Sequence, residues 1–341
     1  MIRMAAKHAN VALFIPHAGC PHQCSFCNQR TIAGKASQPT KQDVQKACET
    51  AISSMKTTAE QSQIAFFGGS FTALPQEYML ELLESAYPYV KQGYFSGIRL
   101  STRPDAVDDA MVTLLKRYGV NTIELGAQCM NDDVLALNER GHLVRQVEIA
   151  SACIKKQGIS LVLQMMTGLY GSSDMTDKQT AEQFVKLQPD GVRIYPTVVV
   201  EGTHLAELYR QGRYMPQALE KAVMLCAELL EFFEEQQQIP VIRLGLHAEQ
   251  DLIKGLLAGP WHPSFRELCE NRLFFQKALE MLQTTYPAGG EVTVCVHPRS
   301  ISKMIGQGKQ NLQQLKQHGY CVSVVSDESL ANRQIKIISR K

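Results

Sequence analysis

Short apolar runs rich in Val, Ile and Leu alternate along this chain with amphipathic segments that have the period of a helix. Because parallel strands are joined by crossovers long enough for a helix, this alternation predicts βα units around a parallel sheet. The predicted strands are residues 11–17, 63–68, 97–103, 122–128, 160–166, 191–200 and 241–247. The predicted helices are residues 41–55, 76–90, 108–118, 132–137, 145–157, 177–187 and 217–235.

These units predict an α/β fold, an open or partial (β/α)6-type barrel, over residues 1–254. In such a barrel the chemistry collects on the loops that follow the C-terminal ends of the strands. Residues 255–290 are expected to form a helical extension and hinge, and residues 291–341 a small basic α+β module. The elements expected in that module are a strand at 292–296, one broken or two short helices within 302–318, and strands at 321–325 and 334–338.

Length, hydropathy and charge limit the classes of protein to consider. With 341 residues, 45% of them hydrophobic, the chain can bury a substantial core. No apolar run approaches the roughly 20 residues that span a bilayer, and the N-terminus lacks the apolar stretch of a signal peptide, so we expect no membrane association and a cytoplasmic location. The net charge is only +2, but residues 297–341 carry eight Lys or Arg against two acidic residues.

Three of the ten cysteines crowd into a short segment, whereas the others lie singly in predicted elements. Cys20, Cys24 and Cys27 have the spacing C-x3-C-x2-C, directly after the first predicted strand. Three thiolates can hold three irons of a 4Fe-4S cluster and leave the fourth iron open. The amine and carboxylate of S-adenosylmethionine (SAM) can chelate that iron, and reduction of the sulfonium would give a carbon radical. A zinc site that includes His17 or His22, or three thiols without a ligand, are the alternatives.

Several motifs carry a family resemblance. Through Cys20, Cys24, Phe26 and Cys27 the chain resembles the radical SAM superfamily. The motifs at residues 66–72, 101–105, 123–128, 139–142, 193–197, 202–203 and 208–214 resemble the radical SAM lobe of the Elongator catalytic subunit and its bacterial relatives. The resemblance covers about residues 10–250 and implies a partial barrel that holds a 4Fe-4S cluster and SAM.

The resemblance also implies SAM-binding positions at two strand ends. Gly68 and Gly69 lack side chains, so their backbone can approach the SAM amino group, and Ser70 stands where many relatives have an acidic residue. Thr102 and Arg103 follow the third strand, and a turn with a helix cap is the alternative for them.

Three further positions are SAM candidates. Gln128 can donate and accept hydrogen bonds at once, which suits a ribose. Arg140 can pair with a carboxylate, although a surface arginine is the alternative. Tyr195 shares a strand face with Arg193, and an interior arginine needs an anionic partner, for which an internal salt bridge is the alternative.

The basic C-terminal module departs from the Elongator pattern. Elongator-like subunits continue into an acetyltransferase domain, for which this chain leaves too little length, so an acetyltransferase partner in trans is an expectation. The segment with Lys303, Gly306, Gly308 and Lys309 resembles a KH motif, in which a glycine-flanked loop clamps RNA phosphates. Lys309 stands where the second glycine is expected; a pyrophosphate loop and a structural cap are alternatives.

Together these features predict a radical SAM enzyme that cleaves SAM reductively to a 5′-deoxyadenosyl radical and modifies a base in tRNA or another RNA. A flavodoxin or ferredoxin is the expected reductant. The alternatives are an enzyme like oxygen-independent coproporphyrinogen oxidase, or another radical SAM enzyme with a small-molecule substrate, and a metal-stabilised RNA-binding protein.

Overall fold

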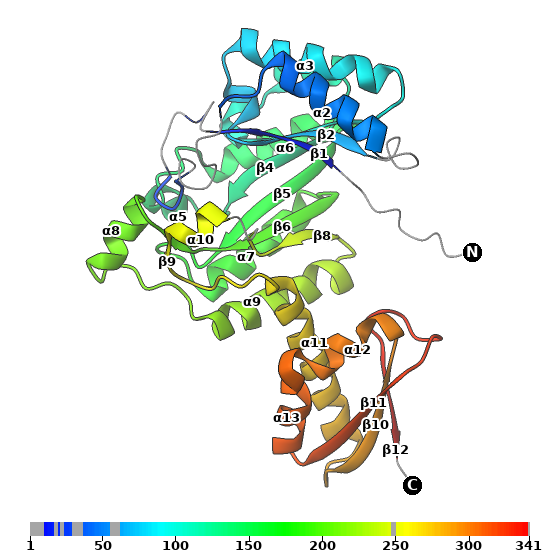
Figure 1. The fold of residues 1–341 in the computed structure, drawn as a ribbon. Coiled ribbons are helices and arrows are strands. Elements are labelled where there is room, and N and C mark those ends of the chain that lie inside the picture. The colour runs from blue at the N-terminus through cyan, green and yellow to red at the C-terminus, as the bar shows by residue number, and fades with distance from the viewer. Residues whose placement is uncertain are drawn as a thin grey trace.

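A computed structural model describes residues 10–16, 20, 24–28, 37–54, 62–246 and 250–339. Its larger lobe is built on a curled parallel sheet, and a smaller lobe follows at the C-terminus (Figure 1). The strand order is β1-β2-β3-β4-β5-β6-β8, so the predicted α/β partial barrel is confirmed. These strands are β1 (Asn10–Ile15), β2 (Gln63–Gly68), β3 (Gly97–Thr102), β4 (Val120–Gln128), β5 (Ser160–Thr167), β6 (Gly191–Pro196) and β8 (Val241–Leu244).

The longest of the predicted strands is interrupted. Residues 191–200 were predicted as one strand, but β6 ends at Pro196, which has no N–H to donate to a neighbouring strand. The chain then turns into β7 (Val199–Val200), which pairs antiparallel with β9 (Leu256–Ala258). β9 lies in a segment for which only helix was predicted.

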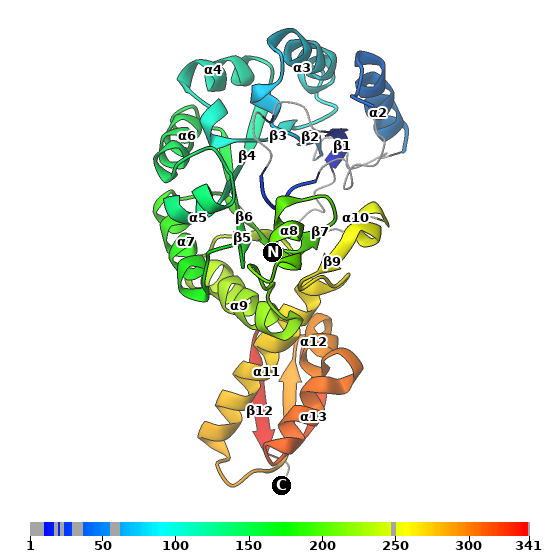
Figure 2. The ribbon, with the colours of Figure 1, turned by 90° about the vertical axis from the view of Figure 1, so that its left-hand side faces the viewer.

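Helices cover the outer face of the curled sheet (Figure 2). The longer ones are α2 (Lys41–Ser54), α3 (Gln76–Lys91), α4 (Asp109–Arg117), α6 (Val144–Lys156), α7 (Asp174–Lys186) and α9 (Leu219–Glu231). Shorter helices are α5 (Asp132–Leu137), α8 (His204–Arg210) and α10 (Gln250–Gly255). α7 begins earlier than predicted because the Ser173 side chain accepts a hydrogen bond from the backbone of Thr176 and caps it. No described helix is long and apolar enough to cross a membrane.

The two faces of the sheet differ in polarity. On the outer face, Ile64, Leu100, Ile123 and Leu163 are fully buried against the helices. Strands of parallel sheets that are covered on both faces are usually apolar throughout. The inner face of this sheet instead carries charged side chains, Arg99, Glu124 and Arg193 among them, joined across the strands by hydrogen bonds. The inner face therefore borders a polar lumen. The functional site lies at the end of this lumen that is formed by the C-terminal ends of the strands.

The C-terminal lobe has its own core, and α11 (Phe265–Thr285) connects it to the barrel. The first turns of α11 pack into the barrel core through Phe265 and Cys269, whereas its second half packs under a three-stranded sheet. The strands of that sheet are β10 (Gly290–Val296), β11 (Tyr320–Ser326) and β12 (Ile335–Ser339). β10 lies between β11, which is parallel to it, and β12, which is antiparallel. Two short helices, α12 (Ile301–Ile305) and α13 (Gln310–Gln317), lie between β10 and β11 in the chain.

Candidate functional site: a cysteine-lined cavity at the strand ends

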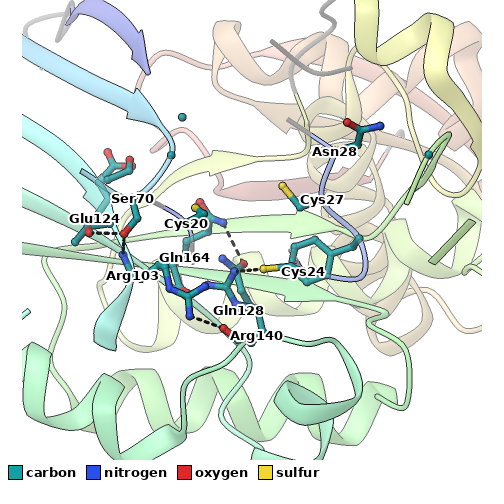
Figure 3. A pocket seen from close by; sticks show the side chains of 17 residues that line it. Cys20, Cys24, Cys27, Asn28, Ser70, Arg103, Glu124, Gln128, Arg140 and Gln164 are labelled. Carbon is teal, nitrogen blue, oxygen red and sulfur yellow. Dashed lines mark hydrogen bonds between the residues drawn. The ribbon is translucent and has the colours of Figure 1, made fainter. Parts of the chain in front are cut away.

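A cavity of about 600 Å³ opens where the C-terminal ends of β2, β3 and β4 meet the cysteine segment (Figure 3). It brings together all three predicted metal ligands and most of the predicted SAM contacts. Its lining residues are Cys20, Cys24, Phe26, Cys27, Asn28, Gly68, Gly69, Ser70, Ser101, Thr102, Arg103, Glu124, Gly126, Gln128, Arg140, Gln164 and Gly202. The strand-end placement that the barrel predicts is therefore what the structure shows.

The cysteine segment is tied to the barrel through Ser25. Its backbone N–H donates to the carbonyl of Asn138 at 3.1 Å, and its hydroxyl donates to the Asn138 side chain at 3.0 Å. The Ser25 carbonyl accepts from the N–H of Leu205, at the start of α8. These contacts hold Cys24 and Cys27, on either side of Ser25, at the cavity wall.

The donors present fit an iron–sulfur cluster. The thiols of Cys20, Cys24 and Cys27 are soft ligands, which suit such a cluster. Burial and the neighbouring Cys24 raise the pKa of the Cys20 thiol, and Arg103 and Arg140 oppose that rise. Among the described residues, no three His, Cys, Asp or Glu side chains lie close enough together to hold one metal ion, whereas in a 4Fe-4S cluster each of the three thiolates would bind a different iron.

Arg140 joins the cysteines to the sheet. Its Nη1 donates to Cys24 Sγ at 3.0 Å and its Nη2 donates to the Gly126 carbonyl at 2.6 Å. The guanidinium also lies 5.9 Å from the centre of the Phe26 ring, within the range of a cation–π contact. Because Arg140 is only 6% exposed, the surface-arginine alternative is wrong.

Hydroxyl groups link the ends of β2 and β3. The hydroxyl of Ser70 lies 2.9 Å from that of Thr102, and it accepts the backbone N–H of Arg103 at 3.1 Å. Thr72 adds a second hydroxyl 2.6 Å from Thr102. Ser70 therefore helps to set the spacing of two strand ends.

The guanidinium of Arg103 is buried beside the cavity. It donates to both carboxylate oxygens of Asp105, at 2.9 and 3.0 Å, and to the Arg140 carbonyl. Its Nη1 is buried without a partner, so one donor remains for a ligand. A turn with a helix cap was the alternative for this segment. The residue that caps the next helix, α4, is Asp108, whose side chain accepts a hydrogen bond from the Met111 backbone. A capping role therefore does not explain Arg103.

Gly68 allows two strands to approach closely. Its φ is +114°, and a Cβ there would lie 2.5 Å from the carbonyl oxygen of Ile15 on β1. The N–H of Gly69 donates to the same carbonyl at 2.8 Å. A side chain at Gly68 would therefore displace β1, the strand that leads into the cysteine segment.

The inner face of β4 supplies two lining residues that were not among the predicted site residues. Glu124 and Gly126 line the cavity with the predicted Gln128, whose side-chain oxygen accepts from Gln164 at 3.1 Å. The sequence could have indicated Glu124 and Gly126 as lining residues because they precede Gln128 by four and two positions, and alternate residues of a strand share a face.

Tyr195 does not line the cavity, so the structure does not bring it to the other predicted SAM contacts. Its hydroxyl accepts a hydrogen bond from Arg193 Nη1 at 3.2 Å. Arg193 Nη2 pairs with Glu124 at 2.7 Å, so the internal salt bridge that the sequence left as an alternative is present.

The RNA candidates lie on the other lobe, away from the cysteines (Figures 1 and 2). Gly306, Gly308 and Lys309 form the connection between α12 and α13, with φ values of +77°, +60° and +63°. Lys309 therefore adopts the left-handed conformation that glycine prefers, at the position where a KH motif would have glycine. Lys303 instead pairs with Glu270 of α11 at 2.7 Å.

Comparisons with known proteins agree with this geometry. A family model described as the radical SAM superfamily matches residues 14–184, and a radical SAM C-terminal domain model matches residues 189–274. The chain belongs to the radical SAM superfamily. It is therefore an enzyme whose cofactors are a 4Fe-4S cluster and SAM, and the zinc, ligand-free and non-enzymatic alternatives are wrong.

The relatives are Elongator-like, as predicted. The chain is 27% identical to a tRNA uridine(34) acetyltransferase of Dehalococcoides mccartyi over 239 residues, which are 60% of this chain and 52% of the relative. It is 29% identical to Elongator complex protein 3 of Saccharomyces cerevisiae over 206 residues, 52% of this chain and 37% of that protein. The structure of Methanocaldococcus infernus Elp3 with an N-terminal deletion matches with a TM-score of 0.62 and 20% identity, over 82% of this chain and 64% of that one. The chain thus spans about half or less of these two curated relatives.

Proposed function

We propose that this radical SAM enzyme modifies a base in tRNA or another RNA. The observation that carries the proposal is that three cysteines meet the polar ends of β2, β3 and β4 in one cavity. The names of the relatives, a tRNA uridine(34) acetyltransferase and Elongator complex protein 3, support RNA as the substrate. The expected acetyltransferase partner in trans and the flavodoxin or ferredoxin reductant belong to the same proposal.

Cys20, Cys24 and Cys27 would hold the cluster, and Arg140, which donates to Cys24 Sγ, would balance part of its negative charge. When bound, the cluster and SAM would supply the radical chemistry, reductive cleavage of SAM to a 5′-deoxyadenosyl radical that could take a hydrogen atom from the substrate. The protein's own contribution is to bind and orient the reactants and to exclude competing reactions.

The strand ends would bind SAM by complementary polar contacts. Backbone groups of Gly68 and Gly69 would face its amino group, and the unpartnered Nη1 of Arg103 would reach its carboxylate. Gln128 would contact the ribose, with its side-chain oxygen oriented by Gln164. Thr102, which lines the same cavity and whose hydroxyl bonds Ser70 and Thr72, would complete this wall of the SAM pocket.

The C-terminal lobe would bind the RNA backbone through the loop that contains Gly306, Gly308 and Lys309. Lys309 is exposed, so its ammonium group can meet a phosphate, whereas Lys303 would first have to leave Glu270. In this proposal Lys303 serves mainly to hold α12 against α11.

Two experiments test the proposal. Anaerobic reconstitution with iron and sulfide, followed by SAM and a reductant, should yield 5′-deoxyadenosine in the wild type and none in Cys24→Ala. Nucleosides in tRNA from cells with and without the protein should then differ in one modified base. Unchanged tRNA, together with SAM cleavage that RNA does not stimulate, would favour a small-molecule substrate.

RNA binding by the C-terminal lobe has its own test. Lys309→Glu should weaken tRNA binding and make it less dependent on salt, because one phosphate contact is lost. Lys186→Glu makes the same charge change at an exposed position of α7 and should leave binding nearly unchanged. Equal effects of the two variants would indicate attraction by net charge alone.

A further inference from the structure

Within the described strands of the partial barrel, Arg99, Arg193 and Arg243 share the inner face of the sheet with Glu124. Arg99 and Arg193 both pair with Glu124 Oε1, at 2.6 and 2.7 Å, and the Glu124 side chain is only 3% exposed. Arg243 on β8 is the Cα partner of Arg193 on β6, so the two side chains leave the sheet on the same face. Among the described residues no acidic side chain pairs with Arg243. This wall therefore carries an excess of positive charge.

The guanidinium of Arg243 is poorly satisfied by the protein. Its Nε donates to the Gly245 carbonyl at 3.0 Å, and in the described part of the chain its two terminal nitrogens have no hydrogen-bond acceptor. Burial and the charge of Arg193 lower the pKa of Arg243, although Tyr195 opposes that effect. Like charges on neighbouring strands in a partly buried site destabilise each other unless an anion lies between them.

Arg193 also has a donor to spare, and its position is firmly held. Its two terminal nitrogens bond Glu124 and Tyr195, its guanidinium lies 5.2 Å from the centre of the Phe67 ring, and its Nε is buried without a partner. Arg193 is held in place by these contacts, and Arg243 beside it is less constrained. Because both guanidinium groups present planar sets of N–H donors, the pair is suited to bind an oxyanion.

This arginine pair lies next to the cysteine-lined cavity. Glu124, which bonds Arg193, is itself part of the cavity lining, whereas neither Arg193 nor Arg243 is. The proposed SAM contacts are on β2, β3 and β4, so the β6 and β8 wall is left for the substrate. A substrate that reaches SAM from this side would bring any anionic group it carries to the two arginines.

We infer that Arg193 and Arg243 form an oxyanion-binding site for a phosphate of the substrate nucleotide. The inference rests on the proposed function, because it assigns the substrate's anionic group to one wall of the same lumen. The carboxylate of SAM has the same chemistry and is the second source that the experiment must distinguish.

The test measures equilibrium binding to the full-length reconstituted enzyme, with uridine 5′-monophosphate, uridine and SAM as separate probes. Arg243→Gln should weaken binding of the monophosphate by about tenfold or more, the usual effect of losing a charge-assisted hydrogen bond. Its affinities for uridine and SAM should not change. Arg117→Gln, which removes an exposed arginine from α4, is the matched control and should change none of the three.

A second measurement guards against a purely structural role for Arg243. Without added anion, Arg243→Gln should melt at the wild-type temperature or above it, because a repulsion is removed. Inorganic phosphate should raise the melting temperature of the wild type and not that of the variant. A variant that melts lower and still responds to phosphate would overturn the inference.

The other outcomes of the binding measurement also decide whether the two arginines bind the substrate phosphate. Equal monophosphate affinity in Arg243→Gln and wild type would refute the site, and weaker SAM binding with unchanged monophosphate binding would assign the arginines to SAM. Because these readouts need no turnover, they stand apart from the tests of SAM cleavage and of tRNA nucleosides. A failure of the RNA proposal there would leave the anion measurement interpretable.

Discussion

His142 is predicted to make this protein sensitive to mild acid. The ring is 3% exposed, and its Nε2 lies 3.3 Å from the Ala127 carbonyl oxygen, so we assign the proton to Nε2 as the donor. Burial, and then the charge of Arg140, lower the pKa of His142 to about 3. The folded protein therefore keeps a neutral imidazole at pH values where the unfolded chain already binds a proton.

The magnitude follows from proton linkage. The folded-state pKa lies below the ordinary value of about 6.5, so this group's contribution to stability is complete above that pH and is lost as the pH falls toward 3. At pH 5 the unfolded state gains about 2 kcal/mol from protonation of one ordinary histidine, and the full loss below pH 3 is about 5 kcal/mol.

The perturbation is His142→Gln, because glutamine places an amide N–H near the position of Nε2 and does not titrate. Urea unfolding of the wild type and the variant at pH 8 and pH 5 gives four free energies of unfolding. The wild type should lose about 2 kcal/mol more than the variant between the two pH values, since all shared groups cancel in the comparison. Losses that agree within about 0.5 kcal/mol would refute the argument that burial keeps His142 neutral.

Three other predictions concern stability. Burial raises the pKa of Asp177 to about 7, so ionisation of this carboxyl lowers the free energy of unfolding as the pH rises from about 4 to 7. In the same urea measurement at pH 8, Asp177→Asn should be more stable than wild type, by about 4 kcal/mol at most. Lys309→Gly should raise the free energy of unfolding by about 1 kcal/mol by relieving the left-handed conformation, and a decrease would indicate that the lysine side chain stabilises the loop. Gly68→Ala should lower the melting temperature far more than Gly93→Ala, since both have positive φ but only Gly68 meets a backbone atom at 2.5 Å; equal losses would contradict the close approach of β1.

The amino-acid sequence by itself determined the parallel α/β partial barrel and the cysteine segment that follows its first strand. Both are local signals. Apolar periodicity identifies strands and helices without knowledge of their partners, and the spacing of Cys20, Cys24 and Cys27 is contained in one loop. Gly68 and Ser70 were singled out through the family resemblance, and the position of Gly68 directly after a predicted strand supported that choice, because the strand ends of a parallel sheet meet at one edge.

Only the tertiary structure decided which polar side chains meet across strands. Period two places Arg193 and Tyr195 on one face, but the pairing of Arg193 with Glu124 depends on how β4, β5 and β6 are aligned. Likewise the burial of Arg140 against Cys24 and the pairing of Lys303 with Glu270 join residues far apart in the chain. Such contacts are set by strand register and by the packing of whole elements, which no local pattern specifies.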